Sequence, residues 1–578
     1  MSTARWLVLL LGLGLATPAA TAGVTVDKPG AASAAGSPEI TVTGVKDRKR
    51  GTWKRAESDH VVLFGQDSAG ELTRISRNLE RLHALMSRLY RHGDTPDDKV
   101  KLQVVLFDQP SSLRAMNLSN VRSAQGPWLP AFADPTYYDP REDGEILAVA
   151  RGEQIVDLNT VRAFNRDCEE YLAQLDTQDG MPLCINLVDR HNPAVMGWEQ
   201  MLYARFAQHF LLTYDPGAYP RWYLDGIGAL FSTVEFRGDG AVDYARPLIP
   251  FLQVIRSYGD LDVDAILTGK YLADPAAKAS WTPYHAWLLA HYFLFSNLKP
   301  ERAAQFRRYM SDVRRGVPMA EAAKGFGSMT ALQREIMRYG ETNILYAVGK
   351  PQPPVAEPVI TTLPLGSAML IQARVALGAR LSGQADDKDP ASPQATWLAQ
   401  AREAANIQYD ASAILFAAEA ECRTGHPSEC MADAERVLAR DPANPNALAW
   451  KGSALTDQAI AGPLANRADM MASARKTIER AIALDPQAPM PLIAYFESFT
   501  KAGEVVPQSA MLGMAEVIRR IPAAPAPRLY LAEELVRQGK PDLARSLLLT
   551  VLDGPYDSPE RKAAETLLAS GSSKLASP

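Results

Sequence analysis

Side chains that could bind a metal or carry out hydrolysis are concentrated between residues 198 and 234. Zinc hydrolysis on a helix uses two histidines four residues apart, because they then lie on one face and share the ion. A glutamate between them takes a proton from the bound water. His209 is the single histidine of this stretch, and Arg205 stands four residues before it. A permanent positive charge beside a dication is unfavourable, so this arrangement predicts no zinc centre.

Two helices are predicted to hold these side chains. Residues 198–212 contain no proline or glycine, and their apolar positions have the spacing of a buried helix. A turn follows at residues 215–217, and Pro220 can open a second helix because its fixed φ and missing N–H cost nothing in a first turn. The apolar positions of the two helices are Met201, Leu202, Phe206, Phe210, Leu211, Trp222, Leu224, Ile227, Leu230 and Phe231.

The residues around these positions resemble the gluzincin-like peptidase families. The first helix of those families reads His-Glu-x-x-His-His-Phe, and the second reads Pro-x-Trp-Tyr-x-Glu-Gly-x-Ala-Glu-x-Phe. This chain has His209-Phe210 at the end of the first motif, and AYPRWYLDG at residues 218–226 followed by Phe231 in the second. The resemblance extends over residues 55–345 and implies an α+β gluzincin-like domain there.

The same resemblance shows which residues replace the zinc site of these peptidases. Ala204 takes the place of the first histidine, Arg205 that of the catalytic glutamate and Gln208 that of the second histidine. Asp225 takes the place of the third ligand. Alanine has no donor atom, and an amide oxygen is a poor zinc ligand. The resemblance therefore implies a pseudoenzyme fold with no catalytic residue, no metal and no cofactor.

An ion pair between the two helices is a further hypothesis. In the family fold, a zinc ion would join the first helix to the second. Arg205 and Asp225 put a cation and a carboxylate on the same two helices. We hypothesise that they pair where zinc would sit, although desolvation can leave the net stabilisation near zero. The alternative is that both side chains point into water.

The remaining elements of this domain are mixed. Residues 60–64, 100–107 and 146–150 have the apolar pattern of strands, and residues 71–90 that of an amphipathic helix. This order predicts a β-α-β beginning. The chain then becomes largely helical, including residues 284–295, YHAWLLAHYFLF.

Other histidines and acids leave an enzyme as the competing interpretation. His285 and His291 lie six residues apart, so on one helix they point about 120° apart and cannot easily share a metal. We interpret both, and His209, as core or rim histidines. The alternative is a hydrolase rebuilt around these histidines or nearby acids, although no serine, cysteine or histidine constellation has a recognisable spacing. The acids concerned are Asp225, Glu235 and Asp239.

From residue 370 the sequence becomes alanine-rich and helical, with recurrent turns. Asp441-Pro442 and Asp485-Pro486 each follow an apolar pair at the same distance and mark the ends of repeats. Small residues stand where two helices of a repeat must approach closely, and glycines stand at the turns between helices. These positions are Ala418, Gly452, Ala532, Ala474, Ala510 and Ala544, with turn glycines Gly425, Gly503 and Gly539.

This pattern resembles the tetratricopeptide repeat, a helical hairpin of about 34 residues. Four copies are predicted, the second lengthened by an insertion near residues 459–467. A less regular pair at residues 370–408 is a candidate cap. The copies run over residues 411–444, 445–488, 489–524 and 525–558. Single repeats cannot bury their own apolar faces, so we expect an all-α tetratricopeptide-repeat solenoid over residues 370–578.

Four cysteines form two local pairs, Cys168 with Cys184 and Cys422 with Cys430. An even count in an exported chain permits disulfides, and each pair would close a short loop. A bridge between Cys422 and Cys430 would fix the two helices of one repeat. Buried free thiols are the alternative.

The ends and joints of the chain predict export and several domains. Residues 1–22 have Arg5, an apolar run and Ala20-Thr21-Ala22, as in a cleaved signal peptide. An uncleaved signal anchor is the alternative. Residues 23–54 are predicted to be a flexible leader and residues 346–369 a proline-rich linker.

These features together predict a secreted or periplasmic, non-catalytic protein. The formal net charge of −5 over 578 residues is mild, and basic clusters are short, so nucleic acid is not an expected partner. No later apolar run is long enough for a membrane helix. We expect a protein or peptide partner to bind the concave surface of the repeats.

Overall fold

The computed structural model describes residues 52–90, 99–116, 136–151, 197–247, 262–273, 282–342, 344–380, 393–552 and 559–575. The predicted signal peptide, most of the predicted leader and the pair Cys168 and Cys184 lie outside these ranges. Residues Arg50–Pro578 form one compact unit. No helix in the described ranges is both long and apolar enough to cross a membrane.

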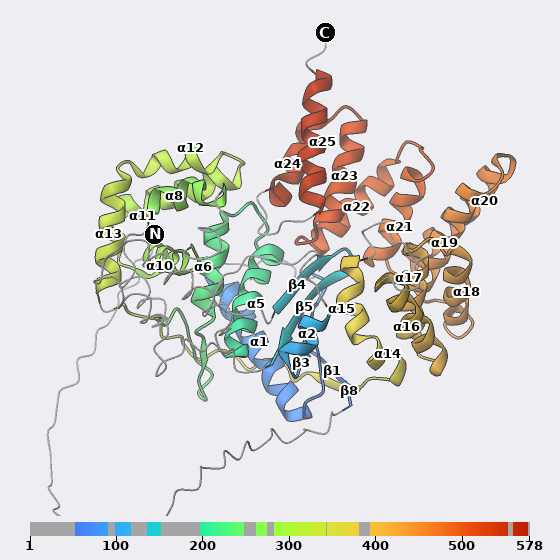
Figure 1. The fold of residues 1–578 in the computed structure, drawn as a ribbon, viewed down its shortest axis with the longest axis horizontal. Coiled ribbons are helices and arrows are strands. Elements are labelled where there is room, and N and C mark those ends of the chain that lie inside the picture. The colour runs from blue at the N-terminus through green and yellow to red at the C-terminus, as the bar shows by residue number, and fades with distance from the viewer. Residues whose placement is uncertain are drawn as a thin grey trace, which may run out of the picture. The chain divides into compact units, whose positions relative to one another are not determined.

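A six-stranded sheet, in the order β4-β5-β3-β2-β1-β8, lies at the centre of the first part of the chain (Figure 1). Strands β2, β3 and β5 run parallel, whereas β4 is antiparallel to β5 and β1 is antiparallel to both β2 and β8. The strands are β1 (Lys54–Glu57), β2 (Val61–Gly65), β3 (Leu102–Phe107), β4 (Thr136–Arg141), β5 (Gly144–Ala150) and β8 (Val359–Thr362). The three strands predicted from alternation are thus confirmed as β2, β3 and β5.

The proline-rich segment does more than link two domains. Its residues Val359–Thr362 form β8 and pair with β1, in a register that places Thr362 opposite Lys54 and Val359 opposite Glu57. Helix α14 (Leu365–Met369) follows directly. The prediction of a linker over residues 346–369 is therefore corrected. The physical reason is that the prolines flank a short β-branched run, and a β-branched run suits a strand.

Helices cover both faces of the sheet. Helices α1 (Ala69–Leu89) and α5 (Trp198–Tyr214) share one apolar cluster with Leu63 and Val104, while α15 (Ile371–Arg380) shares another with Val62 and Val105. Successive residues of a strand point to opposite faces, which explains this alternation. Because both faces are covered, the parallel strands are apolar almost throughout.

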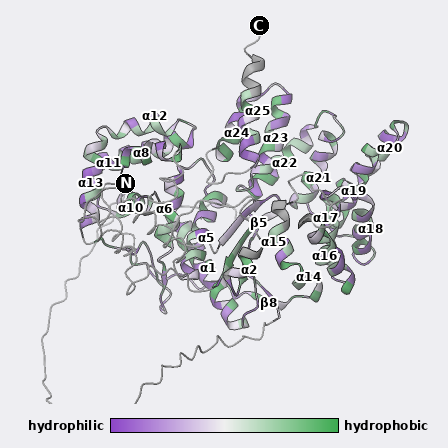
Figure 2. Ribbon diagram, in the orientation of Figure 1, coloured by the Kyte–Doolittle hydropathy of each residue, from purple (hydrophilic) through white to green (hydrophobic). Residues whose placement is uncertain are grey.

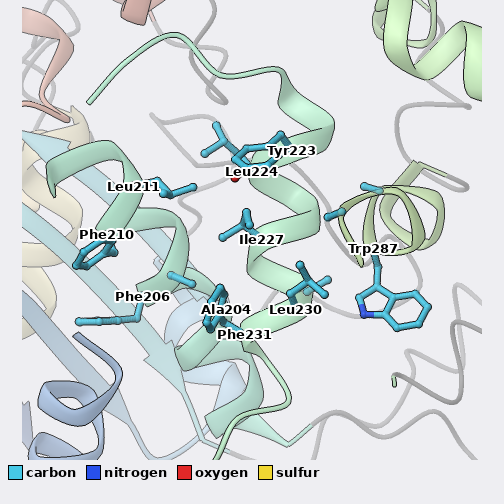
Figure 3. Close-up of a cluster of buried hydrophobic side chains, with 14 of the residues drawn as sticks. Ala204, Phe206, Phe210, Leu211, Tyr223, Leu224, Ile227, Leu230, Phe231 and Trp287 are labelled. Carbon is cyan, nitrogen blue, oxygen red and sulfur yellow. The ribbon is translucent and has the colours of Figure 1, made fainter. Parts of the chain in front are cut away.

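The helical part of this domain packs around α6 (Arg221–Phe231) and α10 (Thr282–Phe295). Figure 3 shows side chains of α5, α6 and α10 meeting in one apolar cluster, with Trp287 on α10. Helix α10 is apolar on nearly all sides because other helices surround it. The smaller elements are α2 (Pro110–Ala115), β6 (Glu235–Phe236), β7 (Val242–Asp243), α8 (Val263–Thr268), α11 (Pro300–Arg314), α12 (Met319–Ala323) and α13 (Met329–Glu341).

Gly226 is required where α6 crosses α10. A Cβ atom at this position would lie 2.5 Å from the carbonyl oxygen of Ala286 and 2.6 Å from Cβ of Ala290. We expect Gly226→Ala to lower the free energy of unfolding by about 2 kcal/mol, because two backbones would have to separate. Gly70→Ala is the matched control, since a Cβ there meets nothing within 4 Å. Urea denaturation of both variants checks this, and an equal stability of the two would contradict the close crossing.

The second part of the chain is built of antiparallel helix pairs, and Figure 2 shows hydrophilic and hydrophobic residues mixed along each helix. The boundaries of the four predicted repeats each enclose one pair. The helices are α16 (Pro393–Ile407), α17 (Ala411–Arg423), α18 (Pro427–Leu438), α19 (Pro445–Ala461), α20 (Leu464–Leu484), α21 (Pro489–Thr500), α22 (Gln508–Arg520), α23 (Pro525–Arg537), α24 (Pro541–Leu552) and α25 (Pro559–Leu575). The predicted small residues are buried between paired helices, and the turn glycines Gly425, Gly503 and Gly539 have positive φ. The region is therefore tetratricopeptide-like.

The predicted disulfide between Cys422 and Cys430 is confirmed, with an S–S distance of 2.02 Å. It joins the end of α17 to the first turn of α18.

Removing this disulfide is expected to loosen the first repeat. The loop that it closes spans a sequence separation of 8 residues, for which the chain-entropy relation gives roughly 2 kcal/mol. We expect Cys422→Ser with Cys430→Ser to lower stability by about that amount. Calorimetry of the double variant, beside oxidised and reduced wild type, checks this. A variant that unfolds at the temperature of the oxidised protein would contradict it.

Candidate functional site

The position predicted for the first zinc histidine lies in the apolar core. Ala204 is fully buried on α5, in the cluster that α5, α6 and α10 share (Figure 3). Phe206 and Phe210 on the same helix are also buried in this cluster. The surroundings of Ala204 are thus those of a packed helix face.

Arg205 points from α5 toward the sheet. Its Nε donates to Thr136 Oγ1 on β4 at 3.0 Å, and its Nη1 donates to Gln208 Oε1 at 3.0 Å. Both the guanidinium and Gln208 are buried. A buried cation without such acceptors would be costly, so these bonds explain how arginine is tolerated here.

Gln208 links the two helices without a metal. While its Oε1 accepts from Arg205, its Nε2 donates to the carbonyl oxygen of Leu224 on α6 at 3.1 Å. Gly228 makes room for this side chain, because a Cβ there would lie 3.0 Å from Nε2 of Gln208. A chain of hydrogen bonds therefore runs from β4 through α5 to α6.

The hypothesis of an ion pair between Arg205 and Asp225 is wrong. No such pair occurs among the residues that the structure describes; Asp225 Oδ2 lies 3.3 Å from Nε of Arg221, one turn earlier on the same helix. The physical reason is local, since residues four apart on a helix are neighbours. Gln208 makes the interhelical link that the hypothesis gave to the ion pair.

His209 is a core histidine in a buried polar row. Its Nδ1 lies 3.1 Å from the hydroxyl of Tyr138 and 3.3 Å from Oγ1 of Thr213, which also donates to Glu145 Oε1 at 3.3 Å. Burial, with a smaller contribution from the charge of His83, lowers the pKa of His209 to about 3. Burial raises the pKa of Glu145 to about 7. The side chain of His209 is therefore neutral at physiological pH.

The other candidate histidines lie on α10, and both ring nitrogens of His291 have hydrogen-bond partners. His291 donates from Nε2 to the carbonyl of Ala245 at 2.9 Å, and its Nδ1 accepts from the hydroxyl of Tyr339 at 2.8 Å. Both ring nitrogens of His291 are therefore hydrogen-bonded within the core. His285 is buried too, and burial lowers its pKa to about 4.

The acids of the competing enzyme interpretation serve the β6–β7 hairpin. Glu235 pairs with Arg246. Asp239 accepts from the backbone N–H of Ala241 at 3.0 Å and contacts Arg237. Both carboxylates are more than half exposed.

A group that the sequence did not single out, His60, Glu80 and His83, has the residue types of a metal site, with ligand atoms within 4.8 Å of one another. Glu80 is already engaged: it accepts from Ser58 Oγ at 2.5 Å, from the backbone N–H of His60 at 2.9 Å and from Nδ1 of His60 at 2.5 Å. The two imidazoles stack at 3.6 Å with planes 17° apart. The nitrogen lone pairs of two stacked imidazoles lie in parallel planes and do not converge on one point. The ring of His60 or of His83 would therefore have to turn before both could bind one ion. The group fits a hydrogen-bonded packing cluster better than a metal centre.

The helical repeats form a second candidate site, a groove along their first helices. The first helices of the four pairs supply it, and we call the surface formed by Arg423, Trp450, Ile493 and Tyr530 the repeat groove. Cavities of about 270 Å³ and about 450 Å³ lie along it. Apolar and charged side chains alternate there, which suits a peptide better than a uniformly charged ligand.

The turn between β4 and β5 occupies one end of the repeat groove. Arg141 Nη2 lies 3.1 Å from Glu419 Oε1, and Arg423 Nη1 lies 3.0 Å from Glu142 Oε1. Both cavities include Arg141 in their walls. The first repeat therefore contacts the turn between β4 and β5, which fills one end of the repeat groove. The polar run Arg141-Glu142-Asp143-Gly144 before the apolar strand β5 is the sequence signal for this turn.

Comparisons with known proteins give two solved structures of low similarity. No family model and no curated protein matches the chain. A solved structure of TTC0263, a thermophilic tetratricopeptide protein of Thermus thermophilus, is 16% identical over 30% of this chain and 91% of its own, with a TM-score of 0.28. The structure of MamA is 15% identical over 32% of this chain and 96% of its own, with a TM-score of 0.21. The repeat assignment therefore rests on the helix pairs described above.

Proposed function

We propose that this chain is an exported, non-catalytic protein. In this proposal a gluzincin-like domain has lost its zinc site, and the repeat groove binds a protein or peptide partner in the cell envelope. The link from Arg205 through Gln208 to Leu224 carries the first half of the proposal. It uses two of the four positions where the family has its ligands and base, and it joins the helices that a metal would join.

Two measurements test the absence of catalysis. Purified mature protein is expected to contain less than a tenth of an equivalent of zinc and to leave casein and generic peptides uncut. Stoichiometric metal with chelator-sensitive cleavage would overturn the proposal in favour of a rebuilt hydrolase. Sequencing of the mature N-terminus tests export, with cleavage expected before Gly23.

The repeat groove supports the second half of the proposal. Tyr530 on α23 is half-buried and lines the smaller cavity, beside Met490 and Lys501 of α21 and the adjoining loop. An aromatic ring next to apolar and charged groups is a typical anchor for a peptide. Leu512 on α22 is 62% exposed and lines neither groove cavity, so it provides a matched control.

A photo-crosslinking experiment tests this binding. A photoreactive amino acid is placed at Tyr530 or at Leu512 in the host, and the proteins captured at each position are identified. The partner is then purified and titrated against wild type, Tyr530→Glu and Leu512→Glu. We expect at least tenfold weaker binding for Tyr530→Glu alone, because a carboxylate would replace the aromatic contact. Equal affinity for all three proteins would overturn the assignment to the groove.

A further inference from the structure

A separate cavity of about 400 Å³ lies between the sheet and the helices that follow it. Strands β2 and β3 with the residues before β3 form one wall, and α14, α15 and α17 form the other. The apolar part of its lining consists of Val62, Phe64, Val100, Leu363, Leu370, Ile371, Ala413 and Phe416, and the polar part of Arg55, Lys101, Gln103, Ser367, Arg374 and Ser412. Its volume lies in the range of small-molecule sites.

The polar part of the lining has an excess of positive charge. It includes three cations, and no acid is among the described residues that line the cavity. Arg55 and Lys101 share one neighbouring carboxylate, that of Glu57, at 2.7 Å and 2.8 Å. Asp410 also lies close, but it accepts hydrogen bonds from the N–H groups of Ser367, Ser412 and Ala413 and from the Ser367 hydroxyl, so its lone pairs are occupied.

Arg374 on α15 is the cation that the protein leaves without a direct acceptor. Among the described residues no hydrogen bond or ion pair involves its guanidinium, and the residue is half-buried. Arg374 also lines the cavity of about 450 Å³, together with Glu419 and Asp143. These acids have other partners: Glu419 lies 3.1 Å from Arg141 and 3.0 Å from Arg423, and Asp143 lies 3.1 Å from Arg141. Burial is the main cause that lowers the pKa of Arg374; the charges of Arg141 and Arg55 also lower it, whereas those of Asp143 and Glu419 raise it. An arginine in this position is costly unless an anion binds to it.

We propose that this cavity binds a small carboxylate carried on an apolar body, such as a medium-chain fatty acid. The carboxylate would take the two parallel N–H donors of Arg374, because a guanidinium matches this anion in a bidentate pair. The apolar body would lie against Phe64, Ile371 and Phe416. A free phosphate fits less well, since most of the lining is apolar and the other two cations already have a carboxylate.

Titration calorimetry on the full mature chain tests the proposal, with decanoate as the probe. Phosphate tests whether a negative charge is sufficient for binding without an apolar chain. A decyl ammonium salt tests whether the apolar chain is sufficient without a negative charge. We expect decanoate to bind at one site and the other two probes to show no binding at the same concentrations. Absence of decanoate binding, or equal binding of the decyl ammonium salt, would overturn the proposal.

Variants locate the site. Arg374→Met is expected to weaken decanoate binding at least tenfold, because it removes a charge-assisted bidentate contact. It should leave the melting temperature of the ligand-free protein unchanged or raised, since it also removes a buried charge. Leu363→Glu, which puts a carboxylate into the wall, should abolish binding and serves as the second variant should Arg374→Met fail to fold. Arg545→Met, in a different cavity, is the matched control. Wild-type affinity in folded Arg374→Met or Leu363→Glu would overturn the assignment.

Discussion

Replacing Trp222 by alanine is expected to lower the free energy of unfolding by about 4 kcal/mol. Trp222 is fully buried at the start of α6, among the rings of Phe293 and Phe306. Its Nε1 donates to the hydroxyl of Tyr309 at 3.2 Å, and that hydroxyl donates to the carbonyl of Leu267 at 2.9 Å. Alanine would leave a large cavity and take away one partner of a buried hydroxyl. The midpoint and slope of urea denaturation measure the loss.

Trp222→Phe separates the two causes. Phenylalanine keeps much of the ring volume but has no N–H group, so we expect a loss of about 1 to 2 kcal/mol. Tyr309→Phe should lower the free energy of unfolding by less in the Trp222→Phe background than in wild type, because the hydrogen bond between the two side chains is already absent there. If Trp222→Ala unfolded within 1 kcal/mol of wild type, the packing of α6 against α11 would not be the major contribution that its burial indicates.

Glu145→Gln is expected to stabilise the protein at high pH by about 3 kcal/mol. Glu145 is fully buried, and its Oε2 has no hydrogen-bond partner in the described part of the chain. Burial raises its pKa from the ordinary 4.5 to about 7, so the folded protein keeps a proton that the unfolded chain releases in this range. Wild-type stability therefore falls as the pH rises from 4.5 to 7. Glutamine cannot ionise and does not suffer this loss.

Chemical denaturation at pH 4, 6 and 8 measures the effect. The difference between Glu145→Gln and wild type should be close to zero at pH 4 and should grow to its full value at pH 8. His209 titrates in the opposite sense: burial lowers its pKa to about 3, so its neutral form favours folding as the pH rises toward 6.5. This contribution is common to both proteins and cancels in the comparison. A difference independent of pH would show that Glu145 is not protonated in the fold.

Several elements could be predicted from the sequence because their signals are local. The apolar spacing of residues 71–90 predicts α1, and Pro220 predicts the start of α6. The repeat boundaries follow from small residues and turn glycines that each repeat needs for itself. Strands β1, β4 and β8 were missed. Each is short or rich in polar residues, and each is a strand because a neighbour supplies its hydrogen bonds.

At the positions that the resemblance aligns with a zinc site, the residue types could be read from the sequence, but their contacts could not. Residue type alone excludes Ala204 as a ligand. The partners of Arg205 and Gln208 lie on β4 and α6, which the order of residues does not place beside α5. The preference of Asp225 for Arg221 depends on the rotamers of one helix surface. The hypothesis used only charge and helix position, and it therefore named the wrong partner for Asp225.

By itself the sequence determined that residues 198–231 form two helices with a single histidine and that the second half of the chain is a run of helical hairpins. Ligand chemistry and helical periodicity depend on residue type and short spacing, so both can be read along the chain. Only the tertiary structure decided that Gln208 joins α5 to α6, that the turn after Arg141 enters the repeat groove, and that Arg374 lines a cavity beside the sheet. These contacts join residues up to 281 positions apart. The burial of the contacting side chains, which sets the strength of the contacts, exists only in the folded chain.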